Sequence, residues 1–159
     1  MINDETRWKS LEDEIVACRR CPRLVEWREE VARTRRRAYR DQVYWGKPVP
    51  GFGDPNGRLL VVGLAPGAHG SNRTGRQFTG DSSGDFLYPA LHQTGFASQP
   101  DAVRRGDSLK LHDLFITSVG RCAPPKNKPT AAELDQCRPF LLAELELMKN
   151  MQGLVALGR

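Results

Sequence analysis

Residues 59–81 read LLVVGLAPGAHGSNRTGRQFTGD, a short apolar run followed at once by a long glycine-rich segment. The run Leu59–Gly63 is bounded by turn-forming residues, which is typical of a buried strand in a parallel sheet. The glycine-rich segment would then lie beyond the carboxyl end of that strand, where open α/β sheets bind ligands. This stretch therefore predicts both the class of fold and the place of a functional site.

The sequence on either side of this stretch alternates between helical and extended patterns. Helices are expected over residues 7–17, 23–39 and 84–95 and after a capping box at Thr130–Glu133, and strands over Leu114–Thr117 and Leu154–Gly158. Strands that alternate with helices favour an α/β fold with a parallel sheet. Residues 45–58 hold four Gly and three Pro and are expected to form a loop. In the helix over 84–95, the side chains predicted to pack inward are Phe86, Leu87, Ala90 and Leu91.

The overall composition indicates one folded domain over residues 1–159. Hydrophobic residues make up 39% of the chain, which is enough for a core, and the net charge of +5 suits a polyanionic partner. No apolar run approaches the ~18 residues that a membrane span needs. The first five residues are polar and acidic, unlike a signal peptide. We therefore expect a cytoplasmic protein without membrane contact.

Four cysteines are spaced as metal ligands are. Cys18 and Cys21 form a CxxC pair, Cys122 follows the second strand, and Cys137 lies on the inward face of the long helix. In a reducing compartment such a set favours a metal over disulfides. Zinc and an iron–sulfur cluster both accept four thiolates, and the spacing alone does not separate them.

The glycine-rich segment matches neither a phosphate-binding P-loop nor the GxGxxG pattern of dinucleotide sites. Its small residues allow the backbone to approach a flat ring, and Phe78 could stack on such a ring. An ordinary connecting loop with Phe78 in the core accounts for the same pattern equally well.

The segment that begins at Gly63 also resembles the first active-site motif of family 5, or type B, uracil-DNA glycosylases. Family 4 enzymes of the same iron–sulfur class carry an acidic residue at the position of Leu64, whereas family 5 has an apolar one. The four cysteines and the Cys122-Ala-Pro-Pro stretch match these families too. The resemblance covers the chain from Cys18 to Arg159. It implies a three-layer α/β/α sandwich and a [4Fe–4S] cluster held by Cys18, Cys21, Cys122 and Cys137, with a structural role.

The resemblance also implies roles for residues around the first strand. The loop of Gly63, Leu64, Ala65, Pro66 and Gly67 would wrap a flipped base, and Phe78 would stack on it. Asp81 matches the carboxylate proposed in the family to assist the attacking water. Ser118 stands where family 4 has an Asn that reads uracil, and a hydroxyl makes fewer hydrogen bonds than an amide. The implied activity is hydrolysis of the glycosidic bond of uracil, and of other deaminated bases, in DNA, by a monomer.

One departure from the family concerns its second motif, His-Pro-Ser, which would follow Leu154–Gly158. None of the three histidines, His69, His92 and His112, occupies that place. On this resemblance we expect the chain to be incomplete at its carboxyl end, without the last strand and helix, and to be poorly soluble and nearly inactive.

Two other classes of protein fit parts of the same sequence. A non-catalytic zinc or iron–sulfur module that binds nucleic acid would explain the cysteines and the basic charge. An iron–sulfur electron carrier would explain the cysteines alone. Neither explains the glycine-rich segment with Phe78 and Asp81.

Overall fold

The computed structural model describes residues 3–158. Along the chain the elements are α1 (Asp4–Ala17), α2 (Pro22–Thr34), the 3-10 turn η1 (Arg37–Tyr39), β1 (Phe52–Gly53), β2 (Leu59–Gly63), α3 (Ser71–Thr74), α4 (Ser82–Gln93), β3 (Leu114–Ser118), η2 (Pro125–Asn127), α5 (Ala131–Leu147) and β4 (Gly153–Ala156). The predicted capping box opens α5, since Thr130 accepts from the backbone of Glu133 and Glu133 accepts from that of Thr130.

The sheet has the strand order β1-β3-β2-β4. The three predicted strands are parallel to one another, with β2 in the centre between β3 and β4. The sheet is mixed rather than wholly parallel, because β1 pairs antiparallel with β3. This short strand lies in the segment predicted as loop. Gly53 permits the pairing, since a Cβ there would lie 2.4 Å from the carbonyl oxygen of Leu114.

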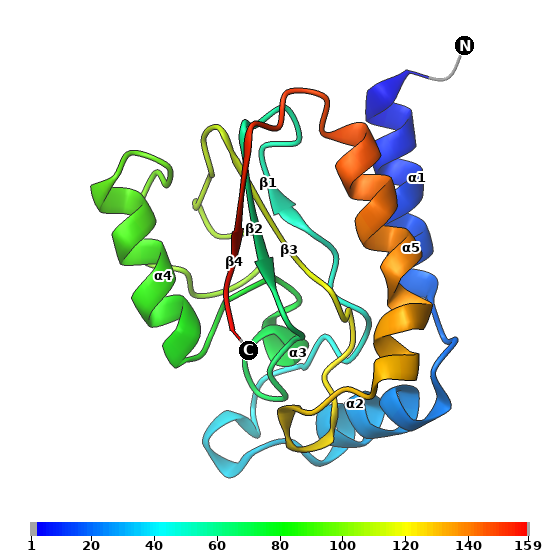
Figure 1. The fold of residues 1–159 in the computed structure, drawn as a ribbon. Coiled ribbons are helices and arrows are strands. Elements are labelled where there is room, and N and C mark those ends of the chain that lie inside the picture. The colour runs from blue at the N-terminus through cyan, green and yellow to red at the C-terminus, as the bar shows by residue number, and fades with distance from the viewer. Residues whose placement is uncertain (1–2, 159) are drawn as a thin grey trace.

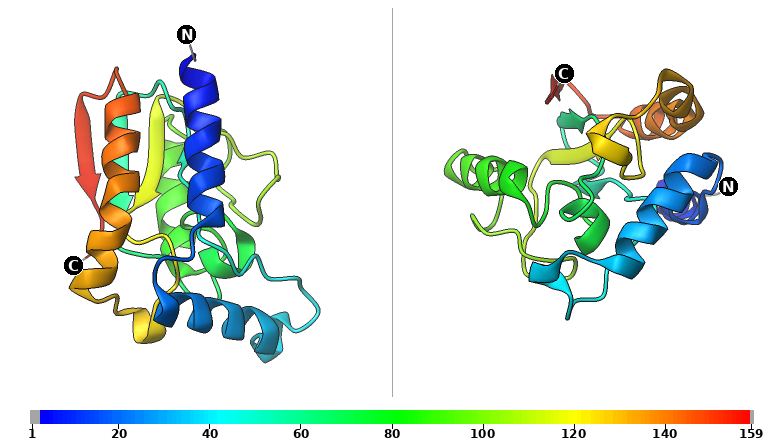
Figure 2. Two further views of the ribbon diagram at one scale, coloured as in Figure 1. Left: turned by 90° about the vertical axis from the view of Figure 1, so that its right-hand side faces the viewer. Right: turned by 90° about the horizontal axis from the view of Figure 1, so that it is seen from below.

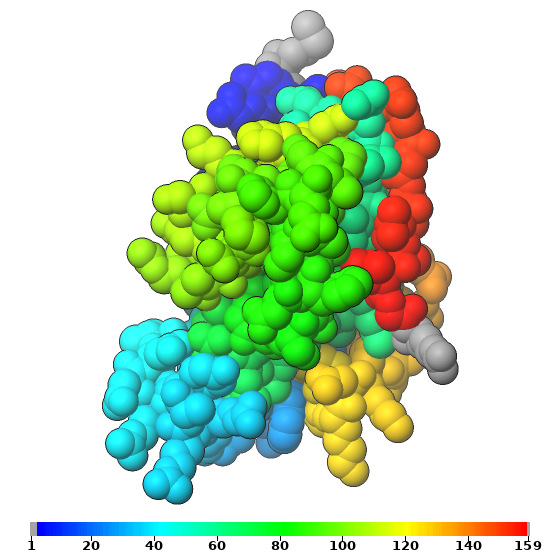
Figure 3. All heavy atoms as spheres, turned by 90° about the vertical axis from the view of Figure 1, so that its left-hand side faces the viewer, coloured from blue at the N-terminus to red at the C-terminus, as the bar shows by residue number. Residues whose placement is uncertain are grey.

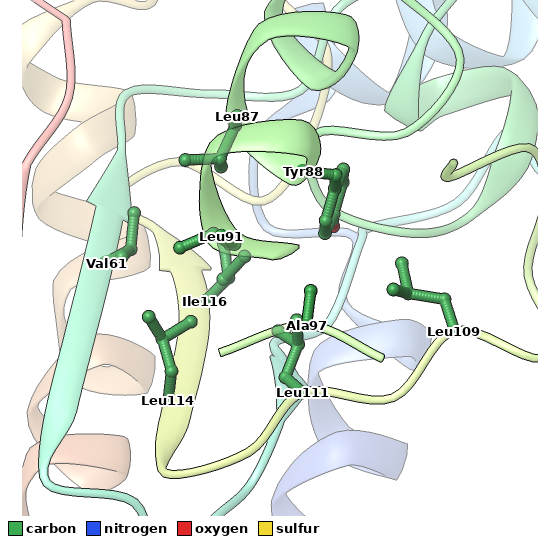
Figure 4. Close-up of a cluster of buried hydrophobic side chains, with 9 residues drawn as sticks. All are labelled: Val61, Leu87, Tyr88, Leu91, Ala97, Leu109, Leu111, Leu114 and Ile116. Atoms are coloured by element: carbon green, nitrogen blue, oxygen red, sulfur yellow. The ribbon is translucent and has the colours of Figure 1, made fainter. Parts of the chain in front are cut away.

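Helices cover both faces of the sheet, so the three-layer α/β/α architecture is confirmed. In Figure 1, α4 lies against one face while α1 and α5 lie against the other. Figure 2 shows α2 crossing the lower end of the molecule, where it contacts α3. The core between α4 and the sheet is drawn in Figure 4. It contains Val61, Leu87, Tyr88, Leu91, Ala97, Leu109, Leu111, Leu114 and Ile116.

Three local predictions were wrong. Phe86 is 78% exposed and Ala90 is exposed too, because the buried stripe of α4 runs through Gly84, Leu87, Tyr88 and Leu91 and leaves positions 86 and 90 outside it. The second helix ends at Thr34 instead of continuing to residue 39. Arg35 has a positive φ of 58° with ψ of 158°, far from helical values, and this ends the helix.

Among residues 3–158, no helix is both long and apolar enough to cross a membrane. The expectations of a monomer and of a cytoplasmic location stay predictions.

Candidate active site

A cavity of about 720 Å³ opens at the carboxyl ends of β2 and β3. Gly63 and Ser118 end these two strands and are paired in the parallel register, so both reach the cavity at the same level. All the residues that the sequence assigned to base binding or catalysis line it, namely Gly63, Leu64, Ala65, Pro66, Gly67, Phe78, Asp81 and Ser118. The structure thus brings the predicted set together at the edge of the sheet where α/β proteins bind ligands.

The ring of Phe78 lies directly against Gly63. A Cβ at position 63 would come within 2.8 Å of that ring, so only glycine allows the contact. Phe78 has a φ of 50°, which is rare for a bulky residue. The backbone on either side is held firmly: Tyr88 donates a 2.6 Å hydrogen bond to the carbonyl of Gln77, and Gly84 fits against the carbonyl of Phe78. The backbone strain at Phe78 is therefore held by its neighbours, and the ring is fixed in the wall of the cavity.

The two carboxylate oxygens of Asp81 have different surroundings. As the N-cap of α4, its Oδ1 accepts hydrogen bonds from the backbone of Ser83 at 3.1 Å and of Gly84 at 3.3 Å. Its Oδ2 faces Gly67 and Gly70, where added Cβ atoms would lie 2.9 and 2.1 Å away. The cap fixes the orientation of the carboxylate, and the glycines leave room for it beside the loop.

Ser118 is almost fully buried, and its hydroxyl is already engaged within the protein. It accepts a 2.9 Å hydrogen bond from Nε2 of Gln77 and donates a 2.7 Å bond to the carbonyl of Gly120. Because its one proton points to Gly120, Ser118 can only accept a hydrogen bond from a ligand. This differs from the role of a residue that reads a base as both donor and acceptor.

Several lining residues were not identified from the sequence. They include His69 and Gln77 of the glycine-rich segment, together with Tyr39 and Asn127 from two other segments that meet at the cavity. Asn127 has a φ of 55° in η2, an arrangement that side-chain polarity alone does not predict. His69 was placed in the motif but given no function. Its Nδ1 lies 2.8 Å from the hydroxyl of Tyr44.

The surroundings of His69 favour the neutral form of its imidazole. Burial lowers the pKa of His69, and the charges of Arg36 and Arg73 lower it further. Arg73 also stacks on Tyr39 at 4.0 Å and donates to the carbonyls of His69 and Gly80. It thereby ties the segment around Tyr39 to the glycine-rich loop.

The rim of the cavity is basic on one side. Arg35, Arg36, Arg37 and Arg40 follow the end of α2, and Arg36 reaches the lining itself. In Figure 3 the segment around residue 40 and the segment around residue 126 project from the same end of the molecule, on either side of the glycine-rich segment. A polyanion could contact both projections at once.

The four cysteines occupy one region at the lower end of α1 and α5. Cys18 ends α1, Cys21 caps α2, and Cys122 and Cys137 are buried. Burial raises the pKa of Cys21 and Cys137, and raises that of Cys122 to about 12. A thiolate at Cys137 also raises the pKa of Cys21 and Cys122, and one at Cys18 raises the pKa of the other three thiols.

Within residues 3–158, no three Cys, His, Asp or Glu side chains are close enough to share a single metal ion. A four-iron cluster requires a different arrangement of cysteines. Each thiolate binds its own iron, so the four sulfurs lie farther apart than they do around a single metal ion. Four free thiols gathered in one largely buried region fit that arrangement better than they fit one zinc ion.

An α/β/α sandwich with an aromatic ring and a carboxylate in a cavity at the carboxyl ends of its central strands suits an enzyme that binds a flat base. The family model of the uracil DNA glycosylase superfamily matches residues 50–159, and the chain belongs to that superfamily. Among named relatives, it is 58% identical to the type-5 uracil-DNA glycosylase of Thermus thermophilus over 91% of its length. It is 55% identical to the type-5 enzyme of Mycobacterium leprae over 93% of its length.

A type-4 uracil-DNA glycosylase of Pyrobaculum aerophilum is less similar, with 36% identity over 72% of the chain. The type-5 enzyme of the same organism is 50% identical over 91%. This contrast confirms the sequence-based distinction between the two types. The chain spans 65% of the length of the Thermus and Mycobacterium leprae relatives and 62% of the Pyrobaculum type-5 relative.

Proposed function

We propose that this protein is a DNA repair glycosylase that hydrolyses the bond between uracil, or another deaminated base, and deoxyribose. The observation that carries the proposal is the fixed pair of Phe78 and Asp81 in one cavity, in a chain of the uracil DNA glycosylase superfamily. Nucleobase enzymes of this kind take the base out of the stack and hold it in a pocket. A cavity of about 720 Å³ has room for a pyrimidine and a water molecule.

In this proposal the flipped uracil stacks on Phe78 above Gly63. Backbone N–H groups of the Gly63–Gly67 loop bind the base oxygens and stabilise the anion that forms when the bond from C1′ to the base breaks. Asp81 orients the water that attacks C1′, and its charge offsets the positive charge that develops on the sugar. The water oxygen bonds to C1′ as the bond to the base breaks, and the proton that the water loses passes to Asp81 and then, through solvent, to the uracil anion, which gives neutral uracil and the abasic product.

The cysteines form the second part of the proposal. Cys18, Cys21, Cys122 and Cys137 would hold a [4Fe–4S] cluster, which ties α1 and α2 to the loop after β3 and to α5. Three of the four thiols have pKa values raised by burial, so metal binding must displace their protons. None of the four cysteines is among the residues that line the base cavity, and this supports a structural function for the cluster.

Base release tests the activity directly. With enzyme in excess over a labelled duplex that contains one U·G pair, we expect uracil release in a single turnover and none from a matched T·G duplex. The abasic product is detected as strand cleavage after alkali. Release from U·G no faster than in buffer, by folded protein that contains iron, would contradict the proposal.

The salt dependence of DNA binding tests the basic rim. Replacing Arg35, Arg36 and Arg37 together by Gln should reduce the slope of the logarithm of the DNA-binding constant against the logarithm of the salt concentration. With fewer phosphate contacts, binding releases fewer counterions from the DNA. If all three contact phosphate, the slope should fall by about 2–3.

The matched control replaces Arg7, Lys9 and Arg138, three exposed cations that pair with acids on α1 and α5. It removes the same charge and should leave the slope near that of the unmodified protein. Equal slopes for both triple variants would mean that the arginines near Tyr39 face solvent without touching DNA.

A further inference from the structure

Among residues 3–158, three arginines, Arg28, Arg76 and Arg121, are almost completely buried, and their partners differ, since Arg76 pairs with Asp107. Arg121 is 1% exposed and forms a two-point ion pair with Glu144, at 2.8 and 2.7 Å, so its charge is balanced. Arg28, on α2, is 2% exposed, and one guanidinium nitrogen donates at 2.6 Å to the carbonyl of Gly46. A carbonyl offers a dipole but no compensating charge.

The nearest acid, Glu29, balances the charge of Arg28 only in part. One oxygen of Glu29 lies 3.3 Å from Nη1 of Arg28, but Glu29 is 46% exposed and already pairs with Arg19. Among residues 3–158, Nε has no hydrogen-bond partner in either Arg28 or Arg121, so these two arginines differ in their charged partners. A buried positive charge that is only partly balanced lowers the stability of the fold. An anion close to Arg28 would remove that cost.

The thiols supply the candidate anion. Nη2 of Arg28 lies 3.4 Å from the carbonyl of Cys18, and the charge of Arg28 acts on Cys122 against the effect of burial. As protonated thiols these cysteines give Arg28 no negative charge. As ligands they are thiolates, and four thiolates outweigh the positive charge of an iron–sulfur core.

We propose that Arg28 is the buried counter-ion of the cysteine-bound cluster, and that it holds the cluster in place and raises its reduction potential. The inference depends on the cluster part of the proposed function but not on the glycosylase reaction. A cation near the cluster stabilises the more negative, reduced form, so removing it must shift the potential to more negative values. The direction is the same for whichever one-electron couple the cluster uses.

The test compares Arg28→Gln and Arg28→Lys with the unmodified protein, all loaded anaerobically. A mediated redox titration followed by electron paramagnetic resonance gives the potential, and a chelator assay gives the rate of iron loss. For Arg28→Gln we expect at least a tenfold less favourable reduction, which is about 59 mV for one electron, and faster iron loss. Arg28→Lys keeps the charge and should stay close to the unmodified protein in both measurements.

Arg19→Gln is the matched control. It removes the same charge from a neighbour of Cys18 that contacts the same Glu29, but Arg19 is 62% exposed, so solvent screens it. The reduction potential of the cluster in Arg19→Gln should change little. A shift as large as that in Arg28→Gln would refute the specific role of the buried charge.

The remaining outcomes also decide the inference. If Arg28→Gln cannot retain iron while Arg28→Lys can, the need for a positive charge is supported. Loss of iron in both variants would assign Arg28 to packing, and an unchanged potential with unchanged iron loss in Arg28→Gln would overturn the proposal. Absence of iron from the unmodified protein would instead refute the cluster itself.

Discussion

Asp81→Asn is expected to slow uracil release by about 10²- to 10³-fold, within the range for loss of a group that assists proton transfer. The substitution removes the charge beside the Gly67 loop, while an Asn side chain caps a helix about as well as Asp does. The start of α4 should therefore persist, and thermal stability should change little. Single-turnover release from a U·G duplex, with melting curves in parallel, measures both effects.

Asp85→Asn provides the comparison, because Asp85 also lines the cavity and lies in the first turn of the same helix. It removes an equal charge near the N-terminus of α4 but not the capping carboxylate. Uracil release by this variant should stay within a few-fold of normal. If both variants lost activity equally, the general negative charge of the cavity would matter and not the position of Asp81.

The largest effect on stability is expected from Cys137→Ser. The four proposed ligands come from three separate parts of the chain, so one missing thiolate removes the tie that the cluster would make between α5 and the two N-terminal helices. We expect the purified variant to lack iron and to lose more than about 4 kcal/mol of stability, as happens when a structural metal site is lost. Iron analysis, visible absorption and denaturant unfolding under anaerobic conditions measure these outcomes.

Leu142→Ser is the control for that experiment, since Leu142 lies on the same helix and is 55% exposed. It introduces the same residue into α5 and should change stability by less than about 1 kcal/mol. A Cys137→Ser protein that kept its colour and its unfolding midpoint would show that Cys137 is only a buried thiol.

The central strands and most helices were predictable because their signals are local. Leu59–Gly63 and Leu114–Ser118 are short apolar runs between turns, and the capping box of α5 is a pattern of four residues. The predicted lining of the cavity also came together, since parallel strands bring their carboxyl ends to one edge.

Other features depend on contacts that no local pattern encodes. β1 exists because Gly53 lets the chain approach the backbone of Leu114. The positive φ angles of Arg35 and Asn127 shape the rim and the lining, although neither residue type demands them. One of the two internal hydrogen bonds of Ser118 comes from Gln77, 41 positions away along the chain.

The packing of α1 against α5 has a consequence for how the protein is made. Leu11 and Ile15 of α1 are covered by Phe140 and Leu147, which lie more than a hundred residues later. At ~5–20 residues per second, the first helix leaves the ribosome roughly ten seconds before its partner is synthesised. During that interval its apolar stripe faces water, so this layer assembles only late in translation, and α1 is the segment of the nascent chain that we expect chaperones to bind.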